Sequence, residues 1–217
     1  MPRRALTRIK INEHPGFSQY YRSLEEVPKP LVFAELFGRT APLELEIGSG
    51  KGLFLRTAAQ RNLEHDFLGV EIGKKYAVLS AAGIAKANLT NAMMICGDAA
   101  QLLDEWISPN SLQAVHVYFP DPWWKRAHKK RRILREEMVK RIERNLQSGG
   151  MLHFRTDVKE YFDTTLALLA SATRLEGPHE IPENEPQHDM DYHTHFERRT
   201  RLHGETVYRA LFVKGNH

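Results

Sequence analysis

From residue 31 onward, short apolar segments typical of β-strands alternate with amphipathic segments typical of helices, and few folds accommodate that order. The expected strands cover residues 43–47, 67–71, 92–96, 114–119 and 151–155, and the expected helices between them cover 53–61, 74–87, 99–106 and 133–147. Because each helix returns the chain to the start of a parallel neighbour, the alternation predicts an α/β protein. Its sheet should be doubly wound and mostly parallel, with helices on both faces.

The C-terminal part of the pattern predicts a change of strand direction. The glycine pair at 149–150, after Ser148, should end the preceding helix. A helix near 158–172 and a strand around 174–181 follow, then a loop rich in Pro, Glu and His. A short basic helix near 195–203 and a last, antiparallel strand over 206–213 complete the expected order.

Length and composition favour one domain. The chain has 217 residues, 41% of them hydrophobic, which suffices for a single large core. Residues 1–30 are polar and lack a sustained period, so we expect a flexible N-terminal arm followed by one domain over 31–217. One cysteine, Cys96, and no apolar run of about 18 residues favour a cytoplasmic protein.

A glycine-rich turn, Glu46-Ile47-Gly48-Ser49-Gly50-Lys51-Gly52, follows the first expected strand. A phosphate-binding P-loop would need glycine at 45 and Ser or Thr at 52, so that motif is excluded. The dinucleotide fingerprint is disfavoured because Leu53 replaces its last glycine. A tight turn without a ligand is the remaining simple alternative, whereas Gly48 and Gly50 would let a ligand approach the backbone closely.

Acidic residues lie at the ends of three successive strands. Besides Glu46, Glu71 ends the second strand, where a carboxylate can accept hydrogen bonds from two ribose hydroxyls. Asp98 follows the third, where it could accept the amino hydrogens of adenine. Each could alone be a solvated turn or a helix cap. Because ligands of open parallel sheets bind at the carboxyl ends of the strands, three such residues favour a nucleoside site.

The fourth strand leads into Phe119-Pro120-Asp121-Pro122-Trp123-Trp124, directly before a basic run. The prolines should stiffen a turn that presents a carboxylate and two indoles, groups suited to a planar base. The net charge of +4 is concentrated over 125–135, which favours an anionic partner over an ordinary solvated face. For one of the two tryptophans, packing over the sheet end is the stronger interpretation.

Two further groups have simpler explanations. A metal site formed by His188, Asp189, Asp191, His193 and His195 is disfavoured, because no cysteine accompanies them and no ligand geometry is evident. A surface loop is the expected interpretation, and no metal is expected. Cys96, at a strand end, is interpreted as a core residue.

Taken together, these motifs resemble the S-adenosylmethionine-dependent methyltransferases with a Rossmann-like sheet. The segments 46–50, 69–71, 119–124, 154–157 and 194–199 are similar to the bacterial tRNA (guanine-N7)-methyltransferase family, over roughly residues 43–213. The resemblance implies methyl transfer from S-adenosylmethionine to guanine N7 in the tRNA variable loop. The expected partner is tRNA, with neither membrane nor metal, and the protein could be a monomer or a homodimer.

The resemblance also implies residue roles. Cofactor contacts are expected from Glu46, Gly48, Gly50, Glu71, Asp98 and Asp121, and Asp121 is also the expected catalytic residue. Substrate contacts are expected from Lys125, Ala127, His128, Lys129, Lys130, Arg131, Arg132, Asp157, Thr194, His195, Phe196 and Glu197.

Guanine N7 carries a lone pair and no proton, so its attack on a sulfonium methyl needs no base. Asp121 could stabilise the purine as positive charge develops. Alternatively, Asp121 or Asp157 could accept the guanine N1 and N2 hydrogens. A base-amino or protein methyltransferase, and an RNA-binding module without catalysis, are the competing functions.

Overall fold

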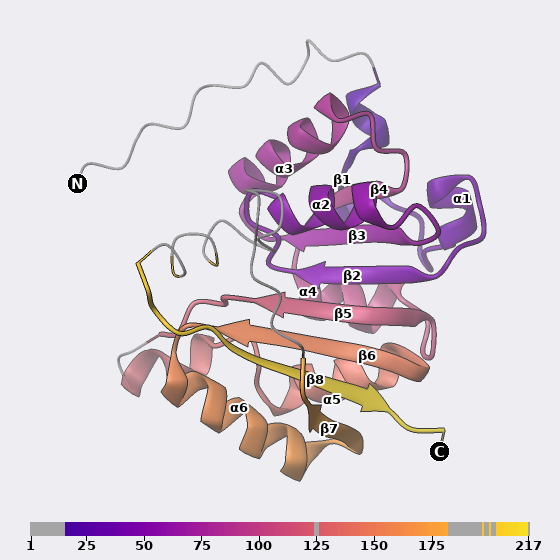
Figure 1. Ribbon diagram of the computed structural model, residues 1–217. Helices are drawn as coiled ribbons and strands as arrows, with labels where there is room; N and C mark the ends of the chain where they lie inside the picture. The colour runs from indigo at the N-terminus through magenta and orange to yellow at the C-terminus, as the bar shows by residue number, and fades with distance from the viewer. Residues whose placement is uncertain (1–15, 124–125, 182–196, 198–199, 201–202, 217) are drawn as a thin grey trace.

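A computed structural model describes residues 16–123, 126–181, 197, 200 and 203–216. Eight strands form one sheet in the order β1-β4-β3-β2-β5-β6-β8-β7 (Figure 1). The strands are β1 (Tyr21–Ser23), β2 (Leu43–Ile47), β3 (Asp66–Glu71), β4 (Ala92–Cys96), β5 (Leu112–Tyr118), β6 (Leu146–Thr156), β7 (Leu175–His179) and β8 (Tyr208–Lys214). Strands β1 to β6 pair in parallel, and β8 lies antiparallel between β6 and β7.

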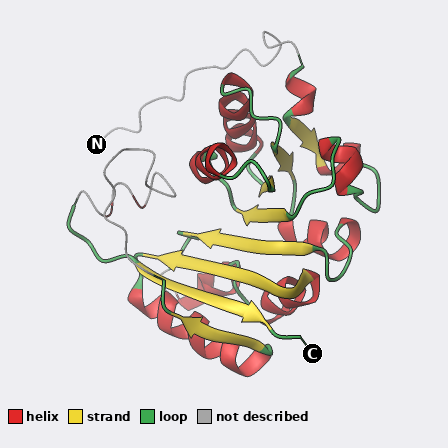
Figure 2. Ribbon diagram, turned by 45° about the vertical axis from the view of Figure 1, so that its right-hand side comes forward, coloured by secondary structure: helices red, strands yellow, loops and turns green. Residues whose placement is uncertain are grey.

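Helices cover both faces of the sheet (Figure 2). The α-helices are α1 (Phe33–Phe37), α2 (Leu53–Arg61), α3 (Lys74–Lys86), α4 (Ala99–Gln101), α5 (Glu136–Asn145) and α6 (Lys159–Ala172). One core, with Phe54, Ala81 and Ile84, packs α2 and α3 onto one face. The other, with Ile142 and Leu169, packs α5 and α6 onto the opposite face. The doubly wound, mostly parallel sheet with an antiparallel last strand is confirmed.

The register of the sheet places the ends of the central strands side by side. Ile47 of β2 pairs with Val70 of β3 on one side and with Val117 of β5 on the other. Glu71, the last residue of β3, pairs with Cys96, the last residue of β4. The turns that follow β2, β3, β4 and β5 therefore meet at one edge of the sheet.

The expectation of a flexible arm over residues 1–30 differs from the structure between 16 and 30. Strand β1 extends the sheet beyond β4, with Tyr21 paired to Met94. It lies between the 3-10 turns η2 (Phe17–Gln19) and η3 (Leu24–Glu26). Leu24 and Val27 are buried in the larger core. Three strand residues among polar neighbours are too few for periodicity to show, so the sequence pattern missed them.

Two helix boundaries also differ from the expectation. The segment 99–106 is α4 followed by one π-helical turn, η4 (Leu102–Trp106). The basic run forms a separate 3-10 helix, η5 (Arg126–Arg131), and α5 begins only at Glu136. The cations therefore lie before the first turn of α5 and not within it, and that first turn is acidic. The N-terminus of α5 therefore does not explain why the cations cluster. The Gly149–Gly150 break follows α5 as expected but lies inside β6, where the register with β5 shifts.

Within the described ranges, no helix combines the length and apolar character that a membrane span needs.

Candidate active site

The glycine-rich turn after β2 exposes its backbone. Gly48 and Gly50 have φ of 76° and 52°, and a Cβ atom added at either would meet no heavy atom within 4 Å. Gly52 differs, because its added Cβ would lie 1.9 Å from the Ser80 hydroxyl oxygen of α3. The left-handed backbone favours glycine at all three positions. The first two leave open space for a ligand, and the third lets α2 approach α3.

Glu71 joins this turn to the end of β3. Its Oε2 accepts a hydrogen bond from the Gly50 amide at 3.0 Å, and its Oε1 accepts one from the Gly73 amide at 2.8 Å. The next residue, Ile72, is 73% exposed. An exposed isoleucine beside a fixed carboxylate offers an apolar surface next to a hydrogen-bond acceptor, an arrangement suited to a nucleoside. Ile72 was missed in the sequence because single apolar residues in turns carry no pattern.

Glu46 is a buried carboxylate. It is 3% exposed, and its Oε2 has no hydrogen-bond partner among the described residues. Burial raises its pKa to about 8, and the nearby charge of Glu71 adds to that rise. The Ser49 hydroxyl donates to the Glu46 backbone carbonyl oxygen at 3.3 Å, and a hydrogen bond from Ser49 to the carboxylate opposes the rise in pKa only in part. A buried, unsatisfied carboxylate oxygen at a strand end is the kind of group that a polar or cationic ligand would satisfy.

Asp98 caps a helix and also faces solvent. Its Oδ1 accepts hydrogen bonds from the amides of Ala100 at 2.7 Å and Gln101 at 3.2 Å. The helix-cap interpretation is therefore correct for one oxygen. The side chain is exposed, and no hydrogen bond within the described part of the chain engages Oδ2. A ligand could use that second oxygen without breaking the cap.

The loop after β5 presents Asp121 to solvent between two unusual backbone conformations. Phe119 and Trp123 have φ of 48° and 45°, in the left-handed region that non-glycine residues rarely occupy. The Phe119 amide donates to the Arg155 carbonyl oxygen at 2.8 Å. The Pro122 carbonyl oxygen accepts from Arg132 Nε at 2.8 Å. These bonds hold the loop on both sides of the exposed Asp121 carboxylate.

The basic segment η5 lies directly beyond this loop. Ala127, Lys130 and Arg131 are exposed, and no ion pair with a described residue neutralises either cation. The Arg131 guanidinium lies 5.1 Å from the centre of the Trp123 ring, and the His128 ring packs edge-on against that indole at 5.8 Å. Trp123 thus packs on the basic segment, whereas the packing expected for one of the two tryptophans was over the end of the sheet.

Two of the expected substrate-binding residues are buried in ion pairs. Arg132 is 7% exposed, and its Nη2 lies 2.5 Å from a carboxylate oxygen of Glu160. Glu197 is also buried, and its Oε1 lies 3.1 Å from Nη1 of Arg155. Neither pairing could be predicted from the sequence, because the partners are 28 and 42 residues apart.

The remaining expected site residues divide into two groups. Asp157 is exposed directly after β6, at the same edge of the sheet as Asp121. Outside the described part of the chain lie Lys125, Thr194, His195 and Phe196, together with the side chain of Lys129. Also outside it lie Trp124 and the loop with His188, Asp189, Asp191 and His193. Among the residues that are described, no group of His, Cys, Asp and Glu has the arrangement of a metal site.

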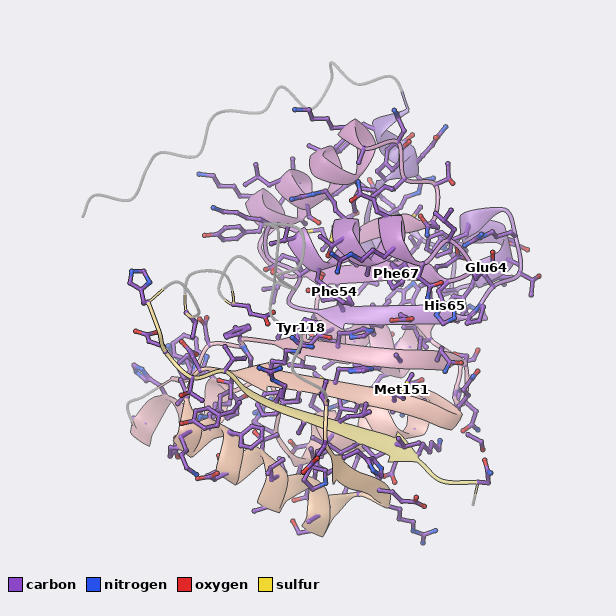
Figure 3. The ribbon with its side chains drawn as sticks, viewed as in Figure 1. Phe54, Glu64, His65, Phe67, Tyr118 and Met151 are labelled. Carbon is purple, nitrogen blue, oxygen red and sulfur yellow. The ribbon has the colours of Figure 1, made fainter. Side chains whose placement is uncertain are left out.

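A polar network that the sequence did not indicate runs through the sheet beneath the site. His116 Nε2 lies 2.6 Å from Glu44 Oε2, and its Nδ1 lies 2.8 Å from the Tyr118 hydroxyl. His65 Nδ1 contacts the other Glu44 oxygen at 2.6 Å. The rings of Phe54 and Tyr118 pack edge to face, with their centres 5.0 Å apart, near the end of β5 (Figure 3).

The protonation of this network follows from burial. Burial lowers the pKa of His116 although Glu44 opposes that change. Burial would raise the pKa of Glu44, but hydrogen bonds from His116 and His65 outweigh it and leave that pKa below its usual range. A neutral His116 that donates from Nε2 to Glu44 and accepts the Tyr118 hydroxyl at Nδ1 satisfies all three groups. The lowered pKa of His116 therefore favours a neutral ring that is hydrogen-bonded to Glu44.

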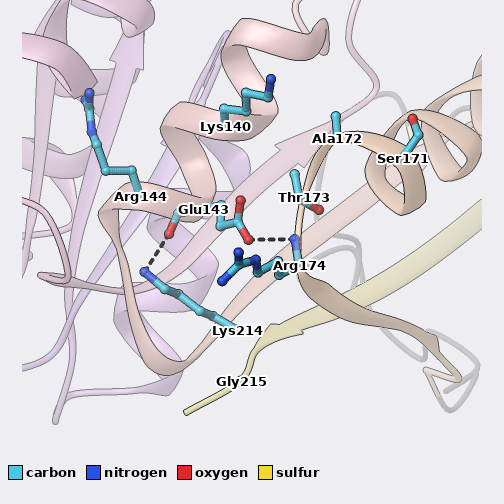
Figure 4. Close-up of a pocket in the computed structure, with 9 residues that line it drawn as sticks. All are labelled: Lys140, Glu143, Arg144, Ser171, Ala172, Thr173, Arg174, Lys214 and Gly215. Atoms are coloured by element: carbon cyan, nitrogen blue, oxygen red, sulfur yellow. Dashed lines mark hydrogen bonds between the residues drawn. The ribbon is translucent and has the colours of Figure 1, made fainter. Parts of the chain in front are cut away.

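A cavity of about 530 Å³ lies at the opposite end of the sheet, between the ends of α5, α6 and β8 (Figure 4). Its basic residues are largely engaged. Lys214 donates to the carbonyl oxygens of Glu143 and Leu146, and Arg144 pairs with Asp104. The Glu143 carboxylate in turn accepts from the Arg174 amide at 2.6 Å. This cavity lies far from the acidic strand ends, and its basic residues are largely engaged within the protein. We therefore place the active site at the strand ends and not in the cavity.

Comparison with known proteins shows which family the chain belongs to. Residues 40–210 match a family model described as "Putative methyltransferase". A tRNA (guanine-N(7)-)-methyltransferase of Rhodopirellula baltica is 46% identical over 220 aligned residues, 99% of this chain and 80% of the relative. The chain belongs to the bacterial tRNA (guanine-N7)-methyltransferase family. A second member, from Yersinia enterocolitica, is 35% identical over 88% of this chain and 80% of its own length.

Two points of this comparison bear on the expectations. The alignment with the Rhodopirellula methyltransferase reaches 99% of the chain, so the similarity extends into the N-terminal segment that we had expected to lie outside it. Solved structures of other methyltransferases share the fold. The 16S rRNA methyltransferase KamB has a TM-score of 0.63 at 16% identity, over 84% of this chain and 92% of that one. The aminoglycoside resistance methyltransferase NpmB1 has a TM-score of 0.56 at 17% identity, over 84% and 91%.

Proposed function

We propose that this protein transfers a methyl group from S-adenosylmethionine to N7 of a guanine in the variable loop of tRNA, in the cytoplasm. Membership of the tRNA (guanine-N7)-methyltransferase family is the observation that carries the proposal. The acidic strand ends beside an exposed basic segment support it independently, because they suit a nucleoside cofactor and a polyanionic substrate on adjoining surfaces.

The residues at the strand ends fit the cofactor. Glu71 is fixed where ribose hydroxyls can donate to it, and the exposed Oδ2 of Asp98 can accept the adenine amino hydrogens. Ile72 provides an apolar surface for the base. Glu46 has an unsatisfied oxygen beside the open backbone of Gly48 and Gly50. When bound, S-adenosylmethionine supplies a methyl group on a positively charged sulfur.

Asp121 acts by orientation and charge. Guanine N7 has no proton to remove, so the enzyme must align the base and stabilise the positive charge that the purine gains. A carboxylate on a loop that is bonded on both sides meets both needs. Asp157, exposed after the neighbouring strand at the same end of the sheet, is a second candidate for accepting the guanine N1 and N2 hydrogens.

The substrate surface continues from the Asp121 loop over η5. Lys130 and Arg131 are exposed there and can neutralise phosphates, whereas Trp123 is held by Arg131 and His128. Thr194, His195 and Phe196 lie outside the described residues and are assigned to the substrate by family resemblance. The variable-loop guanine is likewise assigned by resemblance.

Product analysis tests the proposal. Purified protein is incubated with methyl-labelled cofactor and bulk tRNA, and the tRNA is digested to nucleosides. We expect label in N7-methylguanosine, and mapping of the labelled position should place it in the variable loop. Label in an adenine or cytosine amino group, or in protein, would establish a different methyltransferase. Binding of tRNA without binding of the cofactor in calorimetry would indicate an RNA-binding protein that lacks catalysis.

A further inference from the structure

Arg132 stands at the end of the basic run, yet its surroundings differ from those of its neighbours. Lys130 and Arg131 are exposed, whereas Arg132 is 7% exposed. To bind phosphate without first breaking its contacts within the protein, an arginine must present its guanidinium to solvent. Burial at this position therefore argues against the RNA contact that resemblance implies for Arg132.

All three guanidinium nitrogens of Arg132 have partners within the protein. Nε donates to the Pro122 carbonyl oxygen at 2.8 Å, and Nη2 pairs with Glu160 at 2.5 Å. Nη1 reaches the Thr164 hydroxyl at 3.4 Å. The guanidinium also stacks over the Tyr161 ring at 4.5 Å. The planar fork of arginine suits this set, because a single ammonium could not reach the loop and the helix together.

These partners lie in two different elements. Pro122 belongs to the loop that carries Asp121, and Glu160, Tyr161 and Thr164 belong to the first turns of α6. Arg132 thus fastens the Asp121 loop to a helix packed in the core. The other end of the loop is fastened by the bond from the Phe119 amide to the Arg155 carbonyl oxygen. Residues in left-handed conformations persist only when their surroundings fix them. One of these bonds is made by Phe119 itself and the other by the residue before Trp123, the two left-handed residues of the loop.

We propose that Arg132 is a positioning residue that holds Asp121 in its productive place through the Pro122 carbonyl, and that it is not an RNA contact. The inference rests on the proposed methyl transfer. A misplacement of about 1 Å at a reacting group can reduce turnover about a hundredfold. Loss of this fastening should therefore lower kcat and leave the affinity for tRNA nearly unchanged.

Arg132→Lys and Glu160→Gln distinguish the two roles. A lysine keeps the charge and would preserve a phosphate contact, but it loses the fork. We expect kcat of Arg132→Lys to fall about tenfold or more, with KM for tRNA and its salt dependence within twofold of wild type. Glu160→Gln should lower kcat about threefold. If Arg132 instead bound RNA, removing its anionic partner would free it, so KM for tRNA would fall and kcat would hold.

Two further variants serve as comparators. Arg141→Gln breaks a similar ion pair that lies away from the site, in which Arg141 Nε is 2.7 Å from Asp104 Oδ2. This variant should leave kcat unchanged. Lys130→Gln should weaken tRNA binding and reduce the slope of log K against log salt by about one. The proposal is overturned if Arg132→Gln reduces that slope as Lys130→Gln does, or if Glu160→Gln tightens tRNA binding at full kcat. Should the Arg132 variants not fold, Glu160→Gln decides alone.

Failure of the proposed function is separable from failure of this inference. If wild-type protein forms no N7-methylguanosine in tRNA, the function is wrong. If the wild type is active and both Arg132→Lys and Glu160→Gln match it in kcat, only the positioning role is wrong. Thermal unfolding of each variant, compared with Arg141→Gln, separates loss of kcat from loss of folded protein.

Discussion

At the scale of single residues, neighbouring charges with similar sequence signals have different roles. Arg131 and Arg132 are adjacent in one basic run, but one is exposed against Trp123 and the other is buried against Glu160. The sequence predicted the acidic strand ends because strand periodicity fixes where a residue falls along a strand. It could not predict the partner of Arg132, because that pairing depends on how α6 packs.

Glu46 combines full burial with an unsatisfied oxygen, so its protonation should affect stability. The pKa of its carboxyl in the folded protein is about 8, above the ordinary value of 4.5. The contribution of this group is therefore fully present below pH 4.5 and is lost as pH rises through 8. Glu46→Gln, which removes the charge, should make the cofactor-free protein more stable than wild type at pH 9. The difference should be on the order of 2 to 4 kcal/mol and should shrink towards pH 5.

Urea unfolding of the cofactor-free wild type and variant at pH 5, 7 and 9 measures this difference. An exposed glutamate of α5, Glu137, provides the matched control, and Glu137→Gln should show no such trend. Equal stability of Glu46→Gln and wild type at every pH would mean that the Glu46 carboxylate is solvated. The same variant should bind S-adenosylmethionine more weakly, as titration calorimetry would show.

Asp121 differs from Glu46 because it is exposed and need not change protonation during turnover. Asp121→Asn keeps the shape of the side chain and removes its charge, so it should lower kcat by about 10² to 10³. The pH profile of kcat should gain no new ionisation. Asp163→Asn, an exposed aspartate that pairs with Lys159 on α6, should retain full kcat. If the wild-type profile of kcat against pH has an ionisation that is absent from the profile of Asp121→Asn, Asp121 instead accepts a proton.

At the scale of elements, regular segments were predicted well and irregular ones poorly. The bounds of β2, β4 and α2 agree with the pattern of apolar residues, because each is uniform in period and closed by glycine or polar residues. The π-turn η4 was predicted as part of an α-helix, and the 3-10 helix η5 lies before the helix expected over 133–147 and was not predicted. A period of 3.6 residues cannot be told from neighbouring periods over five or six residues.

The network beneath the site links β2 to β5 and should make the sheet sensitive to acid. The His116 pKa is lowered by burial, so its contribution is complete above the ordinary value of 6.5 and is lost as pH falls below it. Glu44, Tyr118, His153 and Arg155 are the titratable and charged groups that face the His116 ring. His116→Gln keeps a donor for Glu44 and an acceptor for the Tyr118 hydroxyl but cannot become charged.

We expect wild type to lose stability between pH 7 and pH 5, in part through the protonation of His116. The loss should be smaller in His116→Gln. Urea denaturation at the two pH values, with intrinsic fluorescence as the probe, measures it. An identical loss in the variant would assign the acid sensitivity to other groups.

At the scale of the whole molecule, the fold follows from the order of its elements, but the N-terminal limit of the domain does not. Strand alternation predicted the sheet from β2 onward and the antiparallel β8, since both carry clear apolar patterns. Strand β1 has three residues, all half-buried, and no apolar run in the sequence indicates it. Its place beside β4 is fixed by tertiary pairing and by the burial of the residues that follow it.

This difference gives a test of where the folded unit begins. A chain that starts at residue 31 retains the domain expected from the sequence but lacks β1, Leu24 and Val27. Each of those two side chains is nearly fully buried, and burial of such a side chain is worth about 1.5 to 3 kcal/mol. The shortened chain should therefore be less stable than the full chain by several kcal/mol. It should also aggregate more readily, because the edge of β4 becomes exposed.

Leu24→Ala in the full chain isolates the packing part of this effect, because it leaves the pairing of β1 with β4 in place. A leucine this well buried should cost about 2 to 5 kcal/mol when it is truncated. The shortened chain should lose at least as much, since it also gives up Val27 and the strand itself. Thermal and urea unfolding of the three proteins, with sedimentation to detect aggregates, orders them. If the chain from residue 31 unfolds like the full chain, residues 16–30 pack on the domain without stabilising it, and the boundary expected from the sequence stands.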